Sequence, residues 1–202
     1  DKPVPDAAAL SEVLAVAAAE VPHVRAEAVR WLLERVCGEL GTVEHLRELI
    51  DARHADVRAE ALAAMRREPR FADSPALWMA LAESPYPDVL SALLAHLDER
   101  EKALGAGRVE RVWATTLLSV HRGSRAKRAA LRQIADRIVR WPERADALLP
   151  ILRVALRSVR EAERRAALAA VSRAAFENEA LRASIARHVP ELTLFPSEGA
   201  RA

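Results

Sequence analysis

The chain has 202 residues, 51% of them hydrophobic and only 4% aromatic, and its formal net charge is +2. No apolar run approaches the roughly 18 residues that a membrane-spanning helix requires, so we expect no membrane segment. A lone cysteine, Cys37, excludes an internal disulfide. The alanine-rich stretch 7–19 has no basic n-region and contains Glu12, which makes it a poor signal peptide, so we expect a cytoplasmic protein. Asp1 in first place indicates a trimmed or excised fragment.

Prolines, glycines and capping residues divide the chain into pairs of predicted helices. Pro22 separates a first helix from a second that begins near His23. Capping residues precede three later helices, at Thr42, at Ser74 (followed by Pro75) and at Asp88. Gly105 and Gly107 precede the fourth pair. The pairs span about 6–39, 42–67, 75–99, 108–139 and 143–176, a capping helix lies within 178–189, and the tail is 190–202.

A short pattern recurs in the second helix of every pair. Val24-Arg25-Ala26-Glu27-Ala28 returns as Val57-Arg58-Ala59-Glu60-Ala61, 33 residues later. Weaker copies start at Val89, Ala126 and Glu163, at spacings of 32, 37 and 37 residues. We call the first residue of each copy its anchor. A repeat period of about 20–50 residues is typical of arrays in which each unit buries its apolar face against its neighbours.

Apolar residues recur at fixed distances from the anchors, with the periodicity of an amphipathic helix. Five residues after the anchors stand Val29, Leu62, Leu94, Leu131 and Leu168, and eight after them stand Leu32, Met65, Leu97, Ile134 and Val171. Eight residues before the anchors, an opposing layer is predicted from Val16, Leu49, Leu81 and Leu118. No segment alternates with period two for long enough to make a strand, so the sequence predicts an all-α fold in a single domain, 1–202.

Two turns resemble those of HEAT repeats. Asp56-Val57-Arg58 follows Leu49-Ile50, and Pro87-Asp88-Val89 follows Leu81. In that family an Asp lies in the turn, a Val begins the second helix and a basic residue follows. The basic column is partly kept, as Arg25, Arg58, Lys127 and Arg164, and we interpret it as a structural contact of the repeat. Over residues 6–176 the resemblance implies a right-handed α–α superhelix, a HEAT-like solenoid of about five helical hairpins plus a C-terminal capping helix. Armadillo and tetratricopeptide arrays are the near alternatives.

The patterns of ordinary enzyme chemistry are missing from the sequence. None of the six histidines belongs to a His-Glu-x-x-His motif or a zinc-type His/Cys spacing. No glycine-rich phosphate loop and no Gly-x-Ser-x-Gly elbow occurs. We interpret His54 as a turn residue and Cys37 as a small core residue. The sequence therefore predicts no catalytic residue, no metal ligand and no cofactor.

Arginine is the most distinctive charged residue, and it outnumbers lysine 28 to 3. This excess of arginine reflects either selection for a ligand or a GC-rich genome. Residues 1–100 carry a net charge of −7 and residues 101–202 carry +9. Positions two, six and ten after the anchors are expected to point outward on the concave face. In the last two pairs they include Arg128, Arg132, Arg165 and Arg173. This arginine ridge fits phosphates or an acidic protein surface, and the alternative is a solvated helix face with pairs such as Glu161–Arg165.

The four tryptophans either fill gaps between helices or anchor a partner on the concave face. They are Trp31, Trp78, Trp113 and Trp141. Trp31 is the best anchor candidate, because it stands at the edge of the apolar stripe.

Two classes of function remain. The first is a protein-binding scaffold whose concave or ridge surface takes an acidic or extended protein partner. The second is nucleic-acid binding through the arginine ridge; some bacterial HEAT-like proteins are DNA glycosylases for alkylated bases, but their acid-plus-Trp constellation has no match here. Self-association through the oppositely charged halves is a third interpretation.

Overall fold

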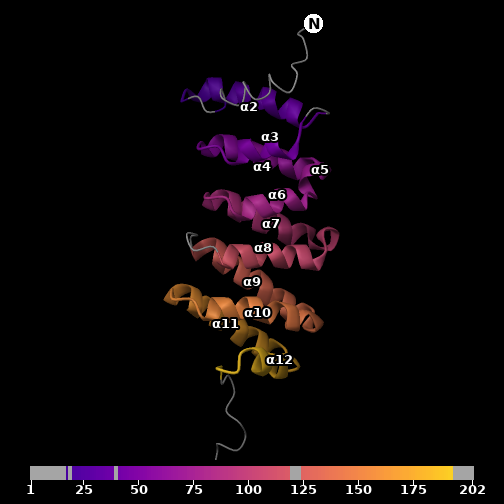
Figure 1. The fold of residues 1–202 in the computed structure, drawn as a ribbon, viewed down its shortest axis with the longest axis vertical. Coiled ribbons are helices and arrows are strands. Elements are labelled where there is room, and N and C mark those ends of the chain that lie inside the picture. Colours follow the sequence, from indigo (N-terminus) through magenta and orange to yellow (C-terminus); the bar gives the residue numbers. More distant parts are fainter. Residues whose placement is uncertain (1–16, 18–19, 39–40, 119–123, 193–202) are drawn as a thin grey trace, which may run out of the picture. The chain divides into compact units, whose positions relative to one another are not determined.

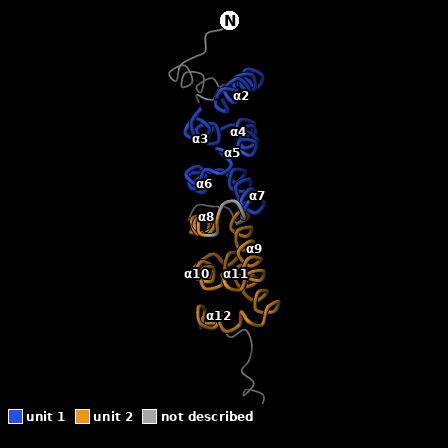
Figure 2. Tube along the Cα trace, turned by 90° about the vertical axis from the view of Figure 1, so that its right-hand side faces the viewer, with its two compact units in different colours: residues 1–104 blue, residues 105–202 orange. Residues whose placement is uncertain are grey.

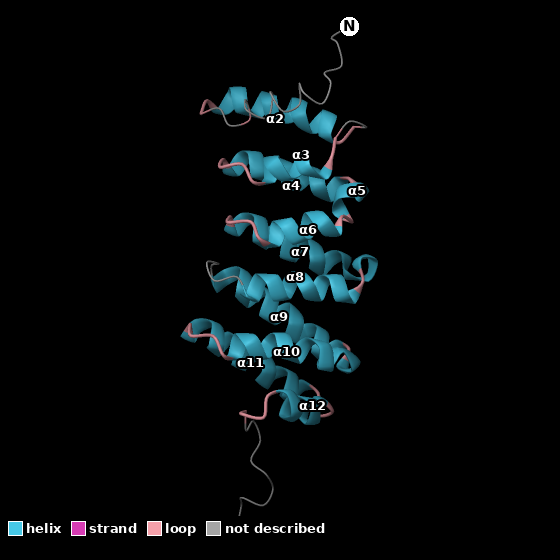
Figure 3. Cartoon of the chain, viewed as in Figure 1, coloured by secondary structure: helices cyan, strands magenta, loops and turns pink. Residues whose placement is uncertain are grey.

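The computed structural model describes residues 17, 20–38, 41–118 and 124–192. Within these ranges every regular element is a helix and no strand is present, as Figure 3 shows. The all-α prediction is therefore confirmed. No helix in this part of the chain is long and apolar enough to cross a membrane. The chain divides into two compact units, residues 1–104 and residues 105–202 (Figure 2). The single domain expected for 1–202 stays a prediction.

Unit 1 arranges its helices in two layers. In chain order they are α2 (Pro22–Val36), α3 (Val43–Ile50), α4 (Ala55–Arg67), α5 (Pro69–Ala72), α6 (Pro75–Ala82) and α7 (Pro87–Leu104) (Figure 1). In one layer α4 packs against both α2 and α7, and in the other α3 packs against α6. The helix pairs predicted at 42–67 and 75–99 are thus α3–α4 and α6–α7. The helix expected before Pro22 falls largely outside the described residues.

Unit 2 repeats the two-layer arrangement. Its helices are α8 (Ala106–Leu118), α9 (Ser124–Arg140), the short 3₁₀ helix η1 (Pro142–Arg144), α10 (Ala145–Leu156), α11 (Glu161–Glu177) and α12 (Leu181–His188). In one layer α9 packs against α11, and in the other α10 packs against both α8 and α12. The capping helix predicted within 178–189 is α12, which also packs against α11. Most of the predicted tail falls outside the described residues.

Two predicted capping residues begin helices as expected. The Thr42 hydroxyl accepts a hydrogen bond from the His45 amide, and the His45 ring accepts one from the Thr42 amide. This reciprocal capping box satisfies two backbone donors that the first turn of α3 leaves without helical partners. At α6 the Ser74 hydroxyl accepts a hydrogen bond from the Leu77 backbone amide, and Pro75 occupies the first helical position.

Other predicted boundaries differ from the structure. Asp88 is not a cap, because α7 begins at Pro87 and Asp88 lies in its first turn. Gly107 lies inside α8 and only Gly105 precedes that helix; its φ of 78° is a left-handed conformation that glycine adopts without strain. The one-turn helix α5 was not expected, since four residues are too few for a periodic pattern.

Most predicted core positions are buried. The residues eight positions after the anchors are all 0% exposed: Leu32, Met65, Leu97, Ile134 and Val171. Four of the residues five positions after the anchors are also buried: Val29, Leu62, Leu94 and Leu131. In the opposing layer Leu49 and Leu81 are each 1% exposed, while Val16 falls outside the described residues. The repeat pattern therefore identifies the inner faces of both layers.

Three predicted core residues are exposed instead. Leu168 and Leu118 are 39% and 60% exposed, and Val24, an anchor residue that the apolar stripe of its helix was also expected to include, is 39% exposed. Leu168 lies on α11, and no later second helix among the described residues covers that side. In α8 the buried stripe ends at Leu117, so Leu118 lies one residue beyond it. In the first turn of α2 it is Arg25, and not Val24, that turns inward.

Ion pairs join successive second helices, and we call them the ion ladder. Each cation stands one position after an anchor, in the pairs Arg25–Asp56 (2.8 Å), Arg58–Asp88 (2.9 Å) and Lys127–Glu163 (3.3 Å). The three cations are nearly buried, at 7%, 6% and 5% exposure. The structural interpretation of the basic column is confirmed for these three residues. It is wrong for Arg164, which is exposed because α11 is the last second helix among the described residues.

Candidate functional site

The outer surface of the second helices follows the repeat. We call positions two, six and ten after the anchors the outward row. Its members are Ala26, Arg30 and Glu34 on α2, Ala59, Ala63 and Arg67 on α4, Ser91, Ala95 and Glu99 on α7, Arg128, Arg132 and Asp136 on α9, and Arg165, Ala169 and Arg173 on α11. All are exposed except Asp136, which is half-buried. The sequence thus predicts correctly which side of each second helix faces solvent.

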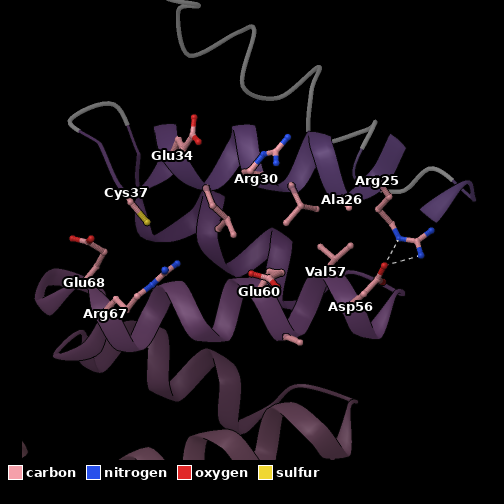
Figure 4. A pocket seen from close by; sticks show the side chains of 13 residues that line it. Arg25, Ala26, Arg30, Glu34, Cys37, Asp56, Val57, Glu60, Arg67 and Glu68 are labelled. Atoms are coloured by element: carbon pink, nitrogen blue, oxygen red, sulfur yellow. Dashed lines mark hydrogen bonds and ion pairs between the residues drawn. The ribbon is translucent and has the colours of Figure 1, made fainter. Parts of the chain in front are cut away.

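A groove of about 820 Å³ opens between α2 and α4 in unit 1, as Figure 4 shows. Its apolar floor consists of Val29, Leu33 and Val57. The outward-row residues Ala26 and Ala59 stand on its two sides, and their small side chains leave the space between the helices open. The groove was not predicted from the sequence, because its volume depends on how far apart the two helices pack.

Charges of both signs surround this groove. Arg30 and Glu34 come from α2, and Glu60 and Arg67 come from α4 (Figure 4). At one end Arg25 donates a hydrogen bond of 2.9 Å to Asp56, and this bond lowers the pKa of the Asp56 carboxyl. The mixed rim does not select a simple anion or cation. It suits a peptide, which offers charges of both signs together with apolar side chains.

Cys37 lines the other end of the groove, near Glu68. It is half-buried at the C-terminal end of α2, so its expected role as a core residue is wrong. Burial raises the pKa of its thiol, and the Glu68 carboxylate raises it further. The thiol therefore stays protonated at neutral pH and is a poor nucleophile.

The structure brings the predicted arginine ridge together in unit 2. Arg128, Arg132, Arg165 and Arg173 are all exposed on the neighbouring helices α9 and α11. Arg173 spans the two helices, with one ion pair of 2.8 Å to Asp136 and another of 2.6 Å to Glu177, and both carboxylates raise the pKa of its guanidinium. Arg165 pairs with Glu161 one turn away at 2.5 Å, as the solvated-face alternative expected. Both ridge arginines of α11 are therefore paired with carboxylates.

Sequence reasoning missed Phe176, which is 81% exposed on α11. It stands three residues after Arg173, so it continues the outward side of that helix. A signal was present, since an aromatic residue at this position cannot join the inner stripe of Ala167, Val171 and Ala174. The ridge thus ends beside a large apolar side chain.

The tryptophans serve mainly as internal packing. Trp78 and Trp113 are buried, and their indole N–H groups donate to the Ala72 carbonyl at 3.1 Å and the Gln133 side chain at 2.9 Å. Trp31 is half-buried and its ring is covered by the Arg35 guanidinium, 3.5 Å from the ring centroid. Trp31 does not line the groove and belongs to unit 1, so it is not part of the arginine ridge.

Among the described residues no group of three His, Cys, Asp or Glu side chains lies close enough together to hold a metal ion. His96 is 1% exposed, and its Nε2 lies 2.8 Å from the Ala72 carbonyl, to which it must donate. His54 precedes α4, which confirms its interpretation as a turn residue.

Comparisons with known proteins add little. No protein-family model and no curated protein matches the chain. Among solved structures, the crystal structure of an engineered protein, a Northeast Structural Genomics Consortium target, is similar at 21% identity; the match covers 95% of this chain and 91% of that one, with a TM-score of 0.42. A likeness this weak carries no conclusion about family or function. The resemblance to HEAT repeats remains a prediction.

Proposed function

We propose that the chain is a non-enzymatic, HEAT-like scaffold of the cytoplasm that binds a protein partner along its outward row. The observation that carries the proposal is the row itself, which recurs on the second helices of each unit and is exposed there at every position but Asp136, which is half-buried. The ion ladder and the buried inner faces hold these helices in place. Within each unit, a surface built from packed helices loses little conformational entropy on binding.

The side chains of the row differ between the units. On α4 and α7 the row is mostly small, with Ala59, Ala63, Ser91 and Ala95, and α2 and α4 enclose a groove with an apolar floor. Small exposed side chains allow a partner's backbone to approach closely, and apolar floors accept its larger side chains. We place the main protein contact on this part of unit 1.

Nucleic-acid binding is the second candidate, and the exposed arginines of α9 favour it. Binding to phosphates would weaken steeply with salt, since each neutralised phosphate releases condensed counterions. Binding to the alanine-rich row of unit 1 would depend much less on salt. This difference separates the two candidates.

The test is affinity capture from the source cell's lysate, with nuclease-treated and untreated samples in parallel. The informative variant is Ala63→Arg with Ala95→Arg, which places two long charged side chains on the row of α4 and α7. The matched control is Ala76→Arg with Ala147→Arg. Both alanines are exposed, but they lie on helices of the other layer, α6 in unit 1 and α10 in unit 2.

A protein recovered from both samples, lost with the row variant and kept with the control variant, is the expected result. Recovery only without nuclease would instead establish the nucleic-acid candidate. Equal recovery by the row and control variants would show that the row of unit 1 is not the contact surface.

A further inference from the structure

We propose that the exposed side of α11 docks an amphipathic helix of a partner protein, one that carries a carboxylate in its first turn. The contact residues are spaced four apart, and we call them the α11 stripe: Arg164, Leu168, Ser172 and Phe176. Residues at this spacing form one of the ridges through which helices pack together. None of the four belongs to the outward row, so this is a second surface, beyond that of the proposed function.

The matching stripes on two earlier second helices are buried. They are Lys127, Leu131, Ala135 and Val139 on α9 and Arg25, Val29, Leu33 and Cys37 on α2. In each stripe the first three residues are buried and the fourth is half-buried. The next second helix packs against each of these helices, α11 against α9 in unit 2 and α4 against α2 in unit 1. The stripe therefore already serves as a helix-packing surface within each unit.

On α11 the same stripe is open. Arg164 is exposed and Ser172 is half-buried, while Leu168 and Phe176 are 39% and 81% exposed. α11 is the last second helix among the described residues, and α12 continues the other layer, where it packs against α10. Terminal repeats of such arrays ordinarily have a polar outer face. Large apolar side chains at two of the four positions instead favour a contact surface, because covering them removes apolar area from water.

The ion ladder specifies the charge that the docked helix must carry. Each ladder cation is the first residue of its stripe, and it binds a carboxylate in the first turn of the next second helix: Asp56, Asp88 or Glu163. Arg164 holds the same position on α11 and is exposed. A helix that docks in the register of the array places its first-turn carboxylate beside this guanidinium.

A second copy of this chain matches the stripe less well. Its α2 has a partly open docking side, because Val24 is exposed and Ala28 and Trp31 are half-buried at positions that are buried on α4. The first turn of α2 contains no acidic residue, however, and His23 stands where α4 has Asp56. A docked α2 would therefore bring no carboxylate to the α11 stripe, and the charge of the stripe favours a partner helix.

The helix α7 supplies a probe of the required chemistry, because it already docks in this way. Asp88 in its first turn binds Arg58, and Val89, Leu93 and His96 on its docking side are buried. The test is fluorescence anisotropy of the full chain with a fluorescein-labelled peptide of residues 87–104. A matched peptide carries Asp88→Lys alone. We expect the natural peptide to bind and the Asp88→Lys peptide to bind at least about tenfold more weakly, since like charges then meet.

A charge swap locates the contact at Arg164. Arg164→Glu should weaken binding of the natural peptide at least about tenfold. The same variant should bind the Asp88→Lys peptide more tightly than the natural chain does, because the swap restores an ion pair. The matched control is Arg165→Glu, which makes the same charge change at the neighbouring exposed residue. It should change neither affinity by more than about twofold.

The apolar part of the stripe has its own variant. Leu168→Ala with Phe176→Ala should weaken the natural peptide severalfold, through loss of apolar contact. The matched control is Val154→Ala with Val159→Ala, because both valines are exposed in unit 2 but lie outside α11. Circular dichroism checks that every variant keeps the helicity of the natural chain.

Three results would overturn the inference: no binding of the natural peptide, equal binding of the Asp88→Lys peptide, or equal effects of Arg164→Glu and Arg165→Glu. Sedimentation velocity at about 0.15 M salt adds a fourth. A dimer that Leu168→Ala with Phe176→Ala abolishes would make a second copy the occupant. The proposed function is tested separately, through Ala63 and Ala95 in unit 1. Failure of either test leaves the other measurable.

Discussion

The charged side chain of Arg58 is buried, and its hydrogen bonds and ion pair offset the cost of removing the charge from water. Its guanidinium binds Asp88 at 2.9 Å and donates to the carbonyls of Ala52 and Arg53, each at 2.9 Å. The Tyr86 ring lies 3.9 Å from the guanidinium carbon and covers its face. The arginine thus satisfies the carbonyls at the α3–α4 turn while it joins α4 to α7. A buried cation with this many partners stabilises a specific register between repeats.

Replacing Arg58 by Ala should lower the free energy of unfolding by about 2–4 kcal/mol, because it leaves two carbonyls and a carboxylate without their donor. Arg66→Ala is the control on the same helix. Arg66 is exposed and makes one long hydrogen bond of 3.4 Å to the Ala92 carbonyl, so we expect a loss below about 1 kcal/mol. Urea denaturation monitored by circular dichroism measures both, and similar losses would show that the ion ladder contributes little.

The Arg25–Asp56 pair predicts a pH dependence. The hydrogen bond from Arg25 lowers the pKa of Asp56 below its ordinary value of 3.8 in the folded chain. A lowered folded pKa contributes stability that is fully present above the unfolded pKa and is lost as the pH falls through the folded pKa. Asp56→Asn should therefore be less stable than the natural chain at neutral pH, and the difference should shrink at acidic pH. Unfolding curves at both pH values measure it, and a difference that grows on acidification would contradict the assignment.

At the scale of elements, the repeat pattern predicts inner faces well and the ends of the stack poorly. Leu94 and Leu168 occupy equivalent positions after their anchors, yet Leu94 is 2% exposed and Leu168 is 39% exposed. The residue type is the same at both, so the sequence alone predicts the same burial. What differs is the place in the chain, because α11 is the last second helix among the described residues.

This pair gives a matched test of the layer packing. Leu94→Ala should destabilise its unit by about 2–5 kcal/mol, since it removes buried methyl groups and leaves a cavity. Leu168→Ala should cost about 1 kcal/mol or less, because the side chain already contacts water. Thermal and urea unfolding measure both variants. Equal losses would mean that Leu168 is covered in solution, for example by another molecule.

The loop between α2 and α3 shows why other contacts escape prediction. Arg70, from the unexpected helix α5, donates to the carbonyls of Val36, Gly38 and Gly41 and so holds the end of α2. Gly41 is required there, since a Cβ atom would lie 1.9 Å from the Val36 carbonyl oxygen. These contacts join residues about thirty positions apart and follow no period. Only the three-dimensional fold reveals them, as it does the groove between α2 and α4.

At the scale of the whole molecule, the asymmetry of charge along the sequence matches the division of the structure into two units. The division into units follows the charge asymmetry closely, because residues 1–104 carry a net charge of −7 and residues 105–202 carry +9. The sequence pattern of the ion ladder is also interrupted between the two units. The positions that would continue it hold Leu90 and Arg125, which cannot form an ion pair.

Oppositely charged units in one chain predict self-association that depends on salt. Unit 1 of one molecule attracts unit 2 of another, and the attraction is strong only where the Debye length is long, about 30 Å at 0.01 M salt against about 8 Å at 0.15 M. Sedimentation velocity should therefore show a mass that rises with protein concentration in low salt and returns to that of a monomer in high salt. Arg128→Glu with Arg132→Glu lowers the charge of unit 2 and should weaken the low-salt association. Association that strengthens with added salt would point instead to apolar contacts, such as those of Phe176, as the cause.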